Sequence, residues 1–427
     1  MRRPEIIDLS LDRVRGALEL LDIEQDQLPP VIHVAGTNGK GSTSAFIRTI
    51  FEHAAYCVHQ FISPHLVRFN ERIVIAGNEV SDEEFLSALA DIEKVTSEIA
   101  LTHFETITCA AFQLFARNHA DVLLLEVGLG GRLDATNAIH QTALSLITPI
   151  DFDHQQFLGN TISQIAAEKS GIFRNGTPAV IGRQSADALA VIRDAASAIG
   201  APIYACGVEW DAYREHDRLI FKDEHELAEY PLPRMLGDHQ IDNAGLAIAA
   251  VKMAAQRNMF TLSEKTIATG IQSTYWPGRL QRLTTGPLVD IITAARNPSL
   301  DIEFWVDGGH NPSAGRAVAR AMSSLEHRSP RRLVLITGMQ ANKDAAGFLA
   351  PFAGLAAKVY CIEASSGTPA IAANIAEAAR KAGLPAETSQ SLNAAIAAAR
   401  QDHPDEPLRV LICGSLYLVG EALTDNN

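Results

Sequence analysis

The chain has 427 residues, of which 47% are hydrophobic and 20% are charged, and its formal net charge at pH 7 is −14. This length and composition predict a globular protein of two or three domains. The acidic balance argues against a nucleic acid or an anionic membrane as a partner, since both favour clustered Lys and Arg.

The sequence also indicates where the protein works. No apolar run approaches the ~20 residues that a membrane-spanning helix needs, and the N-terminal residues lack the apolar core of a signal peptide. The five cysteines are scattered, and none belongs to a C-x-x-C pair. We therefore expect reduced core cysteines in a cytoplasmic protein. We also expect a monomer that has no membrane partner.

Residues 31–43 read as a buried strand, a glycine-rich turn and the start of a helix. The backbone N–H groups of such a turn, the helix N-terminus behind it and the charge of Lys40 together form a phosphate site. The general pattern G-x-x-x-x-G-K-[ST] is not met, because Val34 stands at its first glycine and Gly41 follows the lysine. A shorter variant, G-T-N-G-K-G-S, stands in its place. The alternative is a tight turn with an incidental lysine, but three glycines, a lysine and hydroxyl groups together favour ATP or GTP.

Apolar, strand-like runs alternate with helical stretches along the chain and fall into two sets. The first set lies at residues 31–35, 57–62, 122–127, 143–147 and 179–181, and the second at 304–306, 333–337, 359–362 and 410–413. Near-continuous hydrophobicity is typical of parallel strands buried on both faces, and alternation with helices predicts an α/β architecture.

Two domains are expected from these sets. We predict a large P-loop-type ATP-binding domain with a mainly parallel sheet, residues 1–282, and a smaller Rossmann-like C-terminal α/β domain, residues 283–427. Residues 206–233 are polar and irregular, and we expect a β-rich excursion or a surface loop there.

Polar side chains follow several of these runs, at the strand ends where open α/β sheets bind ligands. Ser63 follows the second run, Glu126 ends an apolar strand and His154 follows the next run. Oxygen ligands suit magnesium, which needs few protein groups because waters and phosphates complete its shell. Taken alone, Glu126 also fits a carboxylate that caps a turn, and His154 fits a core histidine. Their joint occurrence with a phosphate loop favours a metal site.

A series of motifs spans nearly the whole chain. In chain order they are HVAGTNGKGS (33–42), SPHL (63–66), THFE (102–105), LEVGLGGRLDATN (125–137), DH (153–154), EKSGIF (168–173), GDHQ (237–240) with Asn243, PGR (277–279), DGGHNP (307–312), KD (343–344) and CGS (413–415). In content and order this series resembles the folylpolyglutamate synthase/dihydrofolate synthase family, ATP-dependent amide ligases of the Mur ligase superfamily.

The resemblance implies roles for individual residues. The catalytic residues would be Lys40, Lys169 and His310. ATP would be bound by Thr37, Asn38, Gly39, Lys40, Gly41, Ser42, Asn243, Arg279 and Asp307. Magnesium would be bound by Ser63, Glu126 and His154. The pterin substrate would contact Ile7, Asp8, Leu9, Ser10, Thr102, His103, Phe104, Glu105, Leu133, Asp134 and Ala135.

The resemblance also implies the reaction. ATP would phosphorylate the carboxyl group of dihydropteroate or of a folate glutamate tail, and the amine of L-glutamate would displace the phosphate. Lys169 resembles a lysine that this family carbamylates with CO₂, which would give a carboxylate for a second Mg²⁺. The sequence itself shows only a lysine, which also fits a helix surface or a cation on phosphate. His310 is a candidate for favouring the neutral amine.

Two other functions compete with this interpretation. Cell-wall Mur ligases share the phosphate loop but usually carry a UDP-binding domain before it, and here the loop begins at Gly36. A nucleotide-dependent switch protein is suggested by Asn342-Lys343-Asp344, which resembles the N-K-x-D pattern of GTPases, but Asp follows Lys immediately. Release of ADP stimulated by glutamate would favour the ligase over the switch.

Overall fold

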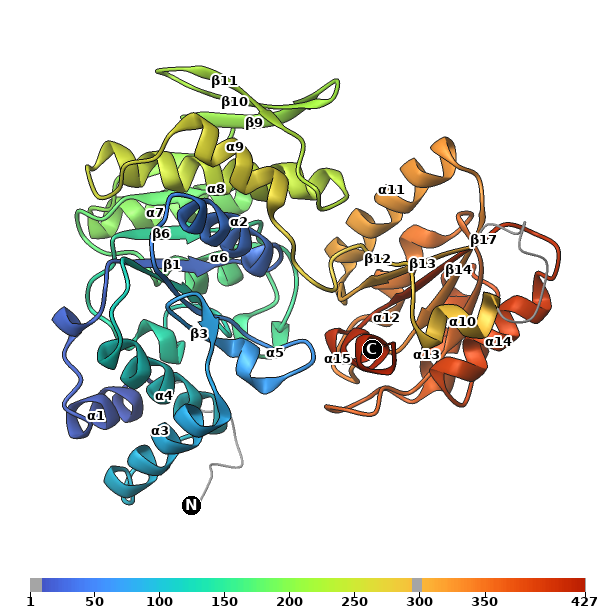
Figure 1. The fold of residues 1–427 in the computed structure, drawn as a ribbon, viewed down its shortest axis with the longest axis horizontal. Coiled ribbons are helices and arrows are strands. Elements are labelled where there is room, and N and C mark those ends of the chain that lie inside the picture. Colours follow the sequence, from blue (N-terminus) through green and yellow to red (C-terminus); the bar gives the residue numbers. More distant parts are fainter. Residues whose placement is uncertain (1–9, 294–301, 427) are drawn as a thin grey trace. The chain divides into compact units, whose positions relative to one another are not determined.

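The computed structural model describes residues 10–293 and 302–426, and the chain divides into two compact units. The first unit runs to Arg234 and includes His239–Tyr275, and the second contains Met235–Asp238 and the residues from Trp276 onward. The division falls before Trp276 because β12 (Gln281–Leu283) pairs with a strand of the second sheet. Both units are α/β structures, as the sequence predicts (Figure 1).

In the described part of the first unit, the main sheet has the strand order β4-β3-β2-β5-β1-β6-β7-β8. The strands are β1 (Val31–Ala35), β2 (Val58–Phe61), β3 (Ile73–Ile75), β4 (Asn78–Glu79), β5 (Val122–Glu126), β6 (Leu144–Ile147), β7 (Ala179–Ile181) and β8 (Ile203–Ala205). All neighbours are parallel except β2–β3 and β3–β4 at one edge. The predicted mainly parallel sheet is confirmed, and each predicted run of the first set lies on one of its strands.

The strand β1 stands where the winding of this sheet reverses. After β1 the chain passes to β2 on one side, and after β5 it crosses to β6 on the other side of β1. Ligands of open α/β sheets bind at the carboxyl ends of strands beside such a reversal. The glycine-rich segment follows β1 directly, so the fold places it at this position.

Helices cover both faces of the first sheet. They are α1 (Asp12–Leu20), α2 (Lys40–His53), α3 (Asp82–Val95), α4 (His103–Arg117), α5 (Gln155–Leu158), α6 (Ile162–Ser170), α7 (Ala186–Ile199), α8 (Asp238–Gln256) and α9 (Glu264–Ser273), with short 3-10 turns η1 (Gln25–Gln27), η2 (Phe69–Arg72) and η3 (Ala135–Ala138). In Figure 1, α2 and α9 lie on one side of β1, and α1, α3 and α4 lie on the other. Leu123 and Leu125 of β5 share a buried core with α4, because alternate residues of a strand face the same side. None of the described helices has the length and hydropathy needed to cross a bilayer.

Residues 206–233 carry a separate antiparallel sheet. Its strands are β9 (Trp210–Glu215), β10 (Arg218–Asp223) and β11 (Leu227–Pro231), in the order β11-β10-β9. The rings of Trp210 and Phe221 are stacked with their centroids 5.9 Å apart, and both side chains are buried. The predicted β-rich excursion is thus the alternative that the structure supports.

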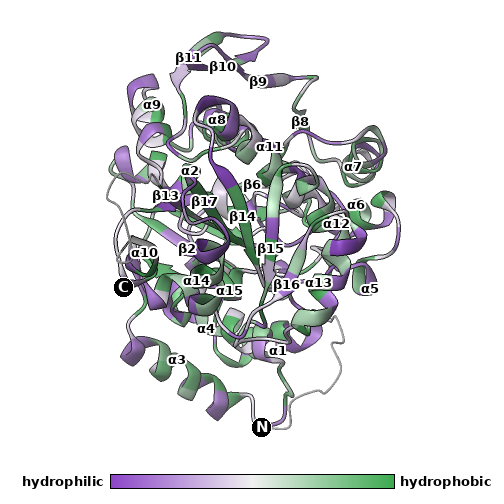
Figure 2. Ribbon diagram, turned by 90° about the vertical axis from the view of Figure 1, so that its right-hand side faces the viewer, coloured by the Kyte–Doolittle hydropathy of each residue, from purple (hydrophilic) through white to green (hydrophobic). Residues whose placement is uncertain are grey.

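In the described part of the second unit, the strand order is β12-β13-β17-β14-β15-β16. Beyond β12, the strands are β13 (Ile302–Asp307), β14 (Arg332–Thr337), β15 (Ala356–Cys361), β16 (Ala386–Thr388) and β17 (Leu408–Cys413), and all pairs except β12–β13 are parallel. The helices are α10 (Pro287–Thr293), α11 (Pro312–Arg328), α12 (Ala345–Leu349), α13 (Ala372–Lys381), α14 (Leu392–Asp402) and α15 (Leu416–Asp425), with the 3-10 turn η4 (Ala350–Phe352). The central strand β14 is largely hydrophobic in Figure 2, as expected for a strand covered on both faces.

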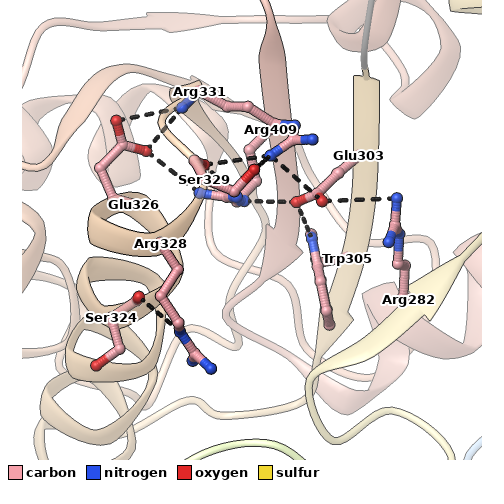
Figure 3. A network of polar contacts seen from close by, with 9 residues as sticks. All are labelled: Arg282, Glu303, Trp305, Ser324, Glu326, Arg328, Ser329, Arg331 and Arg409. Atoms are coloured by element: carbon pink, nitrogen blue, oxygen red, sulfur yellow. Dashed lines mark hydrogen bonds and ion pairs between the residues drawn. The ribbon is translucent and has the colours of Figure 1, made fainter.

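A buried charge network holds the amino ends of β13 and β17 together (Figure 3). Arg409 is only 1% exposed, and its Nε donates to Glu303 Oε2 at 2.8 Å. Its Nη1 donates to Glu326 Oε2 at 3.2 Å, and the Trp305 indole N–H donates to Glu303 Oε2 at 3.2 Å. The two buried charges, Arg409 and Glu303, are therefore paired with each other, which buried charges require, whereas Glu326 is partly exposed.

Candidate active site

The segment Gly36–Ser42 joins the end of β1 to the start of α2. Gly36 and Gly39 have φ values of +147° and +88°, which side chains with a Cβ rarely adopt. A Cβ at Gly36 would overlap Thr148, and a Cβ at Gly39 would overlap the amide of Asn243. Both positions therefore require glycine, and the backbone can fold into a close turn.

The N-terminus of α2 has no side-chain cap. Gly39 is the N-cap residue there. The first N–H groups of a helix have no partner within it, so they can bind an anion. The N–H groups of Thr37 and Asn38 are already used, because both donate to the Pro149 carbonyl, at 3.0 and 3.3 Å. The arrangement fits a phosphate group at the start of α2.

Two lysines converge on one carbonyl of this loop. Lys40 Nζ donates to Gly36 O at 3.2 Å and to Thr37 O at 3.3 Å, and Lys169 Nζ donates to Gly36 O at 2.8 Å. Lys169 lies at the end of α6 and is only 5% exposed. Burial, and then the nearby charge of Lys40, lowers the pKa of Lys169 to about 7. At pH 7, a charged amine and an amine that is about half neutral therefore share this carbonyl.

The predicted metal ligands follow three strands that surround β1 in the sheet. Glu126 is the last residue of β5, lies opposite Val34 of β1 and is 5% exposed. Ser63 comes two residues after β2, and His154 follows β6. The sheet thus brings all three segments to the edge that carries the phosphate loop.

The predicted protein ligands are few for a metal site. His154 has a left-handed backbone, with φ +50°, and its Nε2 lies 3.8 Å from Asp153 Oδ1. Within residues 10–293 and 302–426, no three His, Cys, Asp or Glu side chains form a group that could hold a metal ion. The predicted set includes a hydroxyl, a carboxylate and an imidazole. Such a set fits Mg²⁺ only where phosphate oxygens and water supply the other ligands.

Asn243 of α8 lies against the phosphate loop. Its side chain is buried beside Gly39, and its Nδ2 donates to Gln240 Oε1 at 3.0 Å. Gln240 is 1% exposed, so its buried side chain fixes the orientation of the Asn243 amide through this hydrogen bond. The sequence pattern located Asn243 but gave no role to Gln240 in holding it.

The predicted pterin-binding segment of residues 102–105 lies beside the glycine-rich turn that follows β5. Thr102 and Glu105 form a capping box at the start of α4, and the Phe104 ring packs against Gly128, where a Cβ would overlap it. Arg13 of α1 makes a bidentate ion pair with Glu105, in which Nη2 donates to Oε1 at 2.8 Å and Nε donates to Oε2 at 3.1 Å. Sequence analysis missed Arg13, because a partner 92 residues away leaves no local pattern.

The third segment is organised by Asp134. Its Oδ2 accepts the Leu129 N–H at 2.8 Å, and its Oδ1 accepts the Thr136 N–H at 3.0 Å. Asp134 is 3% exposed and caps η3, while Leu133 beside it is half-buried. In this structure the carboxylate of Asp134 binds its own loop.

The remaining predicted pterin contacts are only partly described. Ile7, Asp8 and Leu9 lie outside the described residues. Ser10 is described, and its Oγ accepts the Asp12 N–H at 3.2 Å. His103 is exposed at the first position of α4, and Ala135 is buried.

Arg279, Asp307 and His310 gather in the second unit. Asp307 ends β13, and its carboxylate accepts the N–H groups of Leu280 at 2.9 Å and Gly309 at 2.8 Å. His310 Nδ1 lies 2.9 Å from Gly308 O, and Arg279 Nη1 donates to Gly278 O at 3.1 Å. These three predicted residues therefore lie in or directly beside two loops, before β12 and after β13, that hydrogen bonds join to each other.

The chain is similar to known ligases over nearly its full length. Residues 34–251 match the Mur ligase middle domain, and residues 292–416 match the Mur ligase glutamate ligase domain. The dihydrofolate synthase/folylpolyglutamate synthase of Escherichia coli (strain K12) is 34% identical over 419 residues, covering 98% of this chain and 91% of that protein.

Solved structures agree with the sequence relatives. The structure of E. coli FolC in complex with DHPP and ADP has a TM-score of 0.86 at 32% identity, over 99% of this chain and 94% of that one. The bifunctional folylpolyglutamate synthase/dihydrofolate synthase of Yersinia pestis, complexed with AMPPNP and Mn ion, has a TM-score of 0.84 at 31% identity, over 98% and 94%.

Proposed function

The chain belongs to the Mur ligase family, and we propose that it links L-glutamate to pteridine acids with the energy of ATP. It is an ATP-dependent ligase that converts dihydropteroate to dihydrofolate and extends the glutamate tail of tetrahydrofolates. The acid's carboxylate oxygen accepts the terminal phosphoryl group of ATP, and ADP leaves. The glutamate nitrogen then bonds to the acyl carbon and loses a proton, and inorganic phosphate leaves.

One observation of the structure supports this function most strongly: the uncapped start of α2, with Lys40 and Lys169 at the same loop carbonyl. Phosphoryl transfer depends on positioning and on charge stabilisation rather than on covalent chemistry by the protein. The loop supplies both, through backbone N–H groups and a fixed positive charge. Lys40 stabilises the charge that develops on the transferred group, and this is its catalytic role.

We propose that the nucleotide contacts Thr37, Asn38, Gly39, Lys40, Gly41, Ser42, Asn243, Arg279 and Asp307. The contact of Asn243 with Gly39 supports its place in this set. Asp307 is held by two backbone N–H groups, and this leaves its carboxylate rigid. Rigid groups lose little entropy when a ligand binds.

A divalent metal accompanies the nucleotide, and we propose Ser63, Glu126 and His154 as its protein ligands. Such a metal offsets negative charge on the phosphates and orients them. Glu126, at the end of β5, is the one carboxylate of the set, so it contributes most of the protein's charge to this site.

We propose further that Lys169 is carbamylated and holds a second Mg²⁺. Carbamate formation needs the neutral amine, which attacks CO₂ and releases one proton. The pKa of about 7 at Lys169 supports this step, because an ordinary lysine is almost wholly protonated at neutral pH. The modification would also turn a cation beside Lys40 into an anion that attracts it.

The pteridine acid is proposed to contact Ile7, Asp8, Leu9, Ser10, Thr102, His103, Phe104, Glu105, Leu133, Asp134 and Ala135. Phe104 packs on Gly128, in the glycine-rich turn that leads to Leu133 along the chain, and this supports a common site for the second and third of these segments. His310 is proposed as the group that favours the neutral amine of glutamate. The enzyme is proposed to act as a cytoplasmic monomer without a nucleic acid partner.

Release of ADP tests the proposed function. Purified protein with ATP and Mg²⁺ is expected to release ADP quickly only when L-glutamate and a pteridine acid are both present. Slow hydrolysis that is indifferent to both compounds would instead indicate a nucleotide-dependent switch.

A further inference from the structure

A fully buried histidine lies on the strand that precedes the phosphate loop and has no role in the proposed reaction. His33 is on β1, between β5 and β6, and is 0% exposed. Its Nε2 lies 2.9 Å from the hydroxyl of Thr136, which is also 0% exposed. The two residues are 103 positions apart in the sequence. This contact therefore joins the central strand of the sheet to the η3 turn.

The contact continues from Thr136 into the loop. The Thr136 hydroxyl lies 2.5 Å from Asp134 Oδ1, and the other oxygen of Asp134 accepts the Leu129 N–H. The result is a chain of hydrogen bonds from His33 through Thr136 and Asp134 to Leu129. Asp134, its third member, belongs to the segment that we propose for the pteridine acid.

The partners of the two His33 ring nitrogens determine which atom donates in each of these hydrogen bonds. His33 Nδ1 is buried and has no hydrogen-bond partner among the described residues. A buried N–H without an acceptor is rarer and more costly than an unused acceptor, so the ring proton belongs on Nε2. Nε2–H then donates to Thr136. The single hydroxyl proton of Thr136 is left to donate to Asp134.

The pKa shifts of His33 and Asp134 agree with this direction of the hydrogen bonds. Burial, and then the nearby charge of Arg174, lowers the pKa of His33 to about 3, so the ring is neutral at physiological pH. Burial also raises the pKa of Asp134, while hydrogen bonds from the Thr136 hydroxyl and from backbone N–H groups act against that rise. A donated hydroxyl proton stabilises the ionised carboxylate.

We propose that His33 is a positioning residue for the pteridine acid, acting through Thr136 to fix Asp134 and the loop of residues 128–135. The proposal rests on the proposed contact of Leu133, Asp134 and Ala135, at the end of that loop, with the pteridine acid. Without the donor on His33, the Thr136 hydroxyl is no longer held in its orientation toward Asp134, and the loop loses a side-chain hydrogen bond to the sheet. Small displacements of positioning groups reduce productive binding, even though they touch no reacting atom.

The test compares substitutions at His33 with a matched control. His33→Leu removes the donor, whereas His33→Gln keeps an N–H group near the place of Nε2. His59→Leu is the control, because His59 is also 0% exposed in the same sheet, and its partners among the described residues are backbone groups, Asn118 O at 3.1 Å and Ala76 N at 3.0 Å. The unfolding midpoint of each variant is also measured, so that a change in KM can be separated from a general loss of stability.

We expect His33→Leu to raise the KM for dihydropteroate about tenfold or more, while the KM for ATP stays close to that of the wild type. His33→Gln should restore much of the loss, and His59→Leu should change neither KM. Thr136→Val should reproduce the effect of His33→Leu, and the double variant should be no worse than either single variant, because both break one chain of bonds.

Equal rises in both KM values for His33→Leu, or additive effects in the double variant, would overturn the proposal. If His33→Leu does not fold, Thr136→Val and ¹⁵N spectra of the wild-type histidine rings still decide it. A proton found on Nδ1 of His33 would contradict the assigned direction. Failure of the proposed function is a separate result, because the wild type would then not convert dihydropteroate at all.

Discussion

Lys169 should react with CO₂ much more readily than an ordinary lysine, because its pKa is lowered. Its pKa of about 7 means that about nine-tenths of the amine is neutral at pH 8, against about 0.3% for a lysine at its ordinary value of 10.5. The buried amine therefore presents about 300 times more of the form that reacts with CO₂. Carbamylation at this one lysine is the expected consequence.

The assay uses ¹³C-labelled bicarbonate. A carbamate signal should appear in the NMR spectrum of the wild type and should be absent from Lys169→Met. Lys252→Met is a matched control, because Lys252 lies in the same unit but is paired with Glu226 and Glu264. It should keep both the signal and the activity.

Activity should follow the modification. Removing CO₂ from the buffer should lower turnover of the wild type, and adding bicarbonate should restore it. A wild type that is fully active without any carbamate signal would refute the reasoning, as would a Lys169 amine that titrates near its ordinary pKa.

Three further substitutions test separate parts of the account. Lys40→Ala should lower turnover about a hundredfold or more with little change in the unfolding midpoint, since Lys40 Nζ reaches only two loop carbonyls; near-normal turnover would remove Lys40 from catalysis. Glu126→Gln should raise the Mg²⁺ concentration needed for half-maximal activity more than about tenfold, and an unchanged Mg²⁺ titration would exclude Glu126 as a ligand. Arg409→Met should destabilise the second unit by about 3 kcal/mol in chemical unfolding, because it leaves the buried Glu303 without its closest cation. The exposed pair of Arg332 on the neighbouring strand is the control, and Arg332→Met should change stability little.

The sequence predicted the central strands of both sheets well because those strands are buried on both faces. β1 and β5 are buried at every position, so their hydrophobic runs are continuous. The short strands β12 and β16 were missed. They lie at the edges of their sheet and are only partly buried, so their residues carry no continuous apolar signal.

The candidate site was predictable where its residues lie close together in the sequence. The loop that contains Lys40 follows one strand and begins one helix, so local pattern was enough to find it. The depressed pKa of Lys169 was not predictable, because it depends on burial and on contact with a loop 133 residues earlier. The hydrogen bonds that link His33 to Asp134 through Thr136 were not predictable for the same reason. The fold brings together residues that no local motif connects.

The most direct measurement incubates the purified protein with ATP, Mg²⁺ and L-glutamate, in parallel on dihydropteroate and on tetrahydrofolate, and determines the mass of each product. Both compounds are expected to gain glutamate through a new amide bond, with one ADP released for each bond. If both pteridine acids were recovered unchanged and no ATP were consumed in their presence, the central claim would be contradicted.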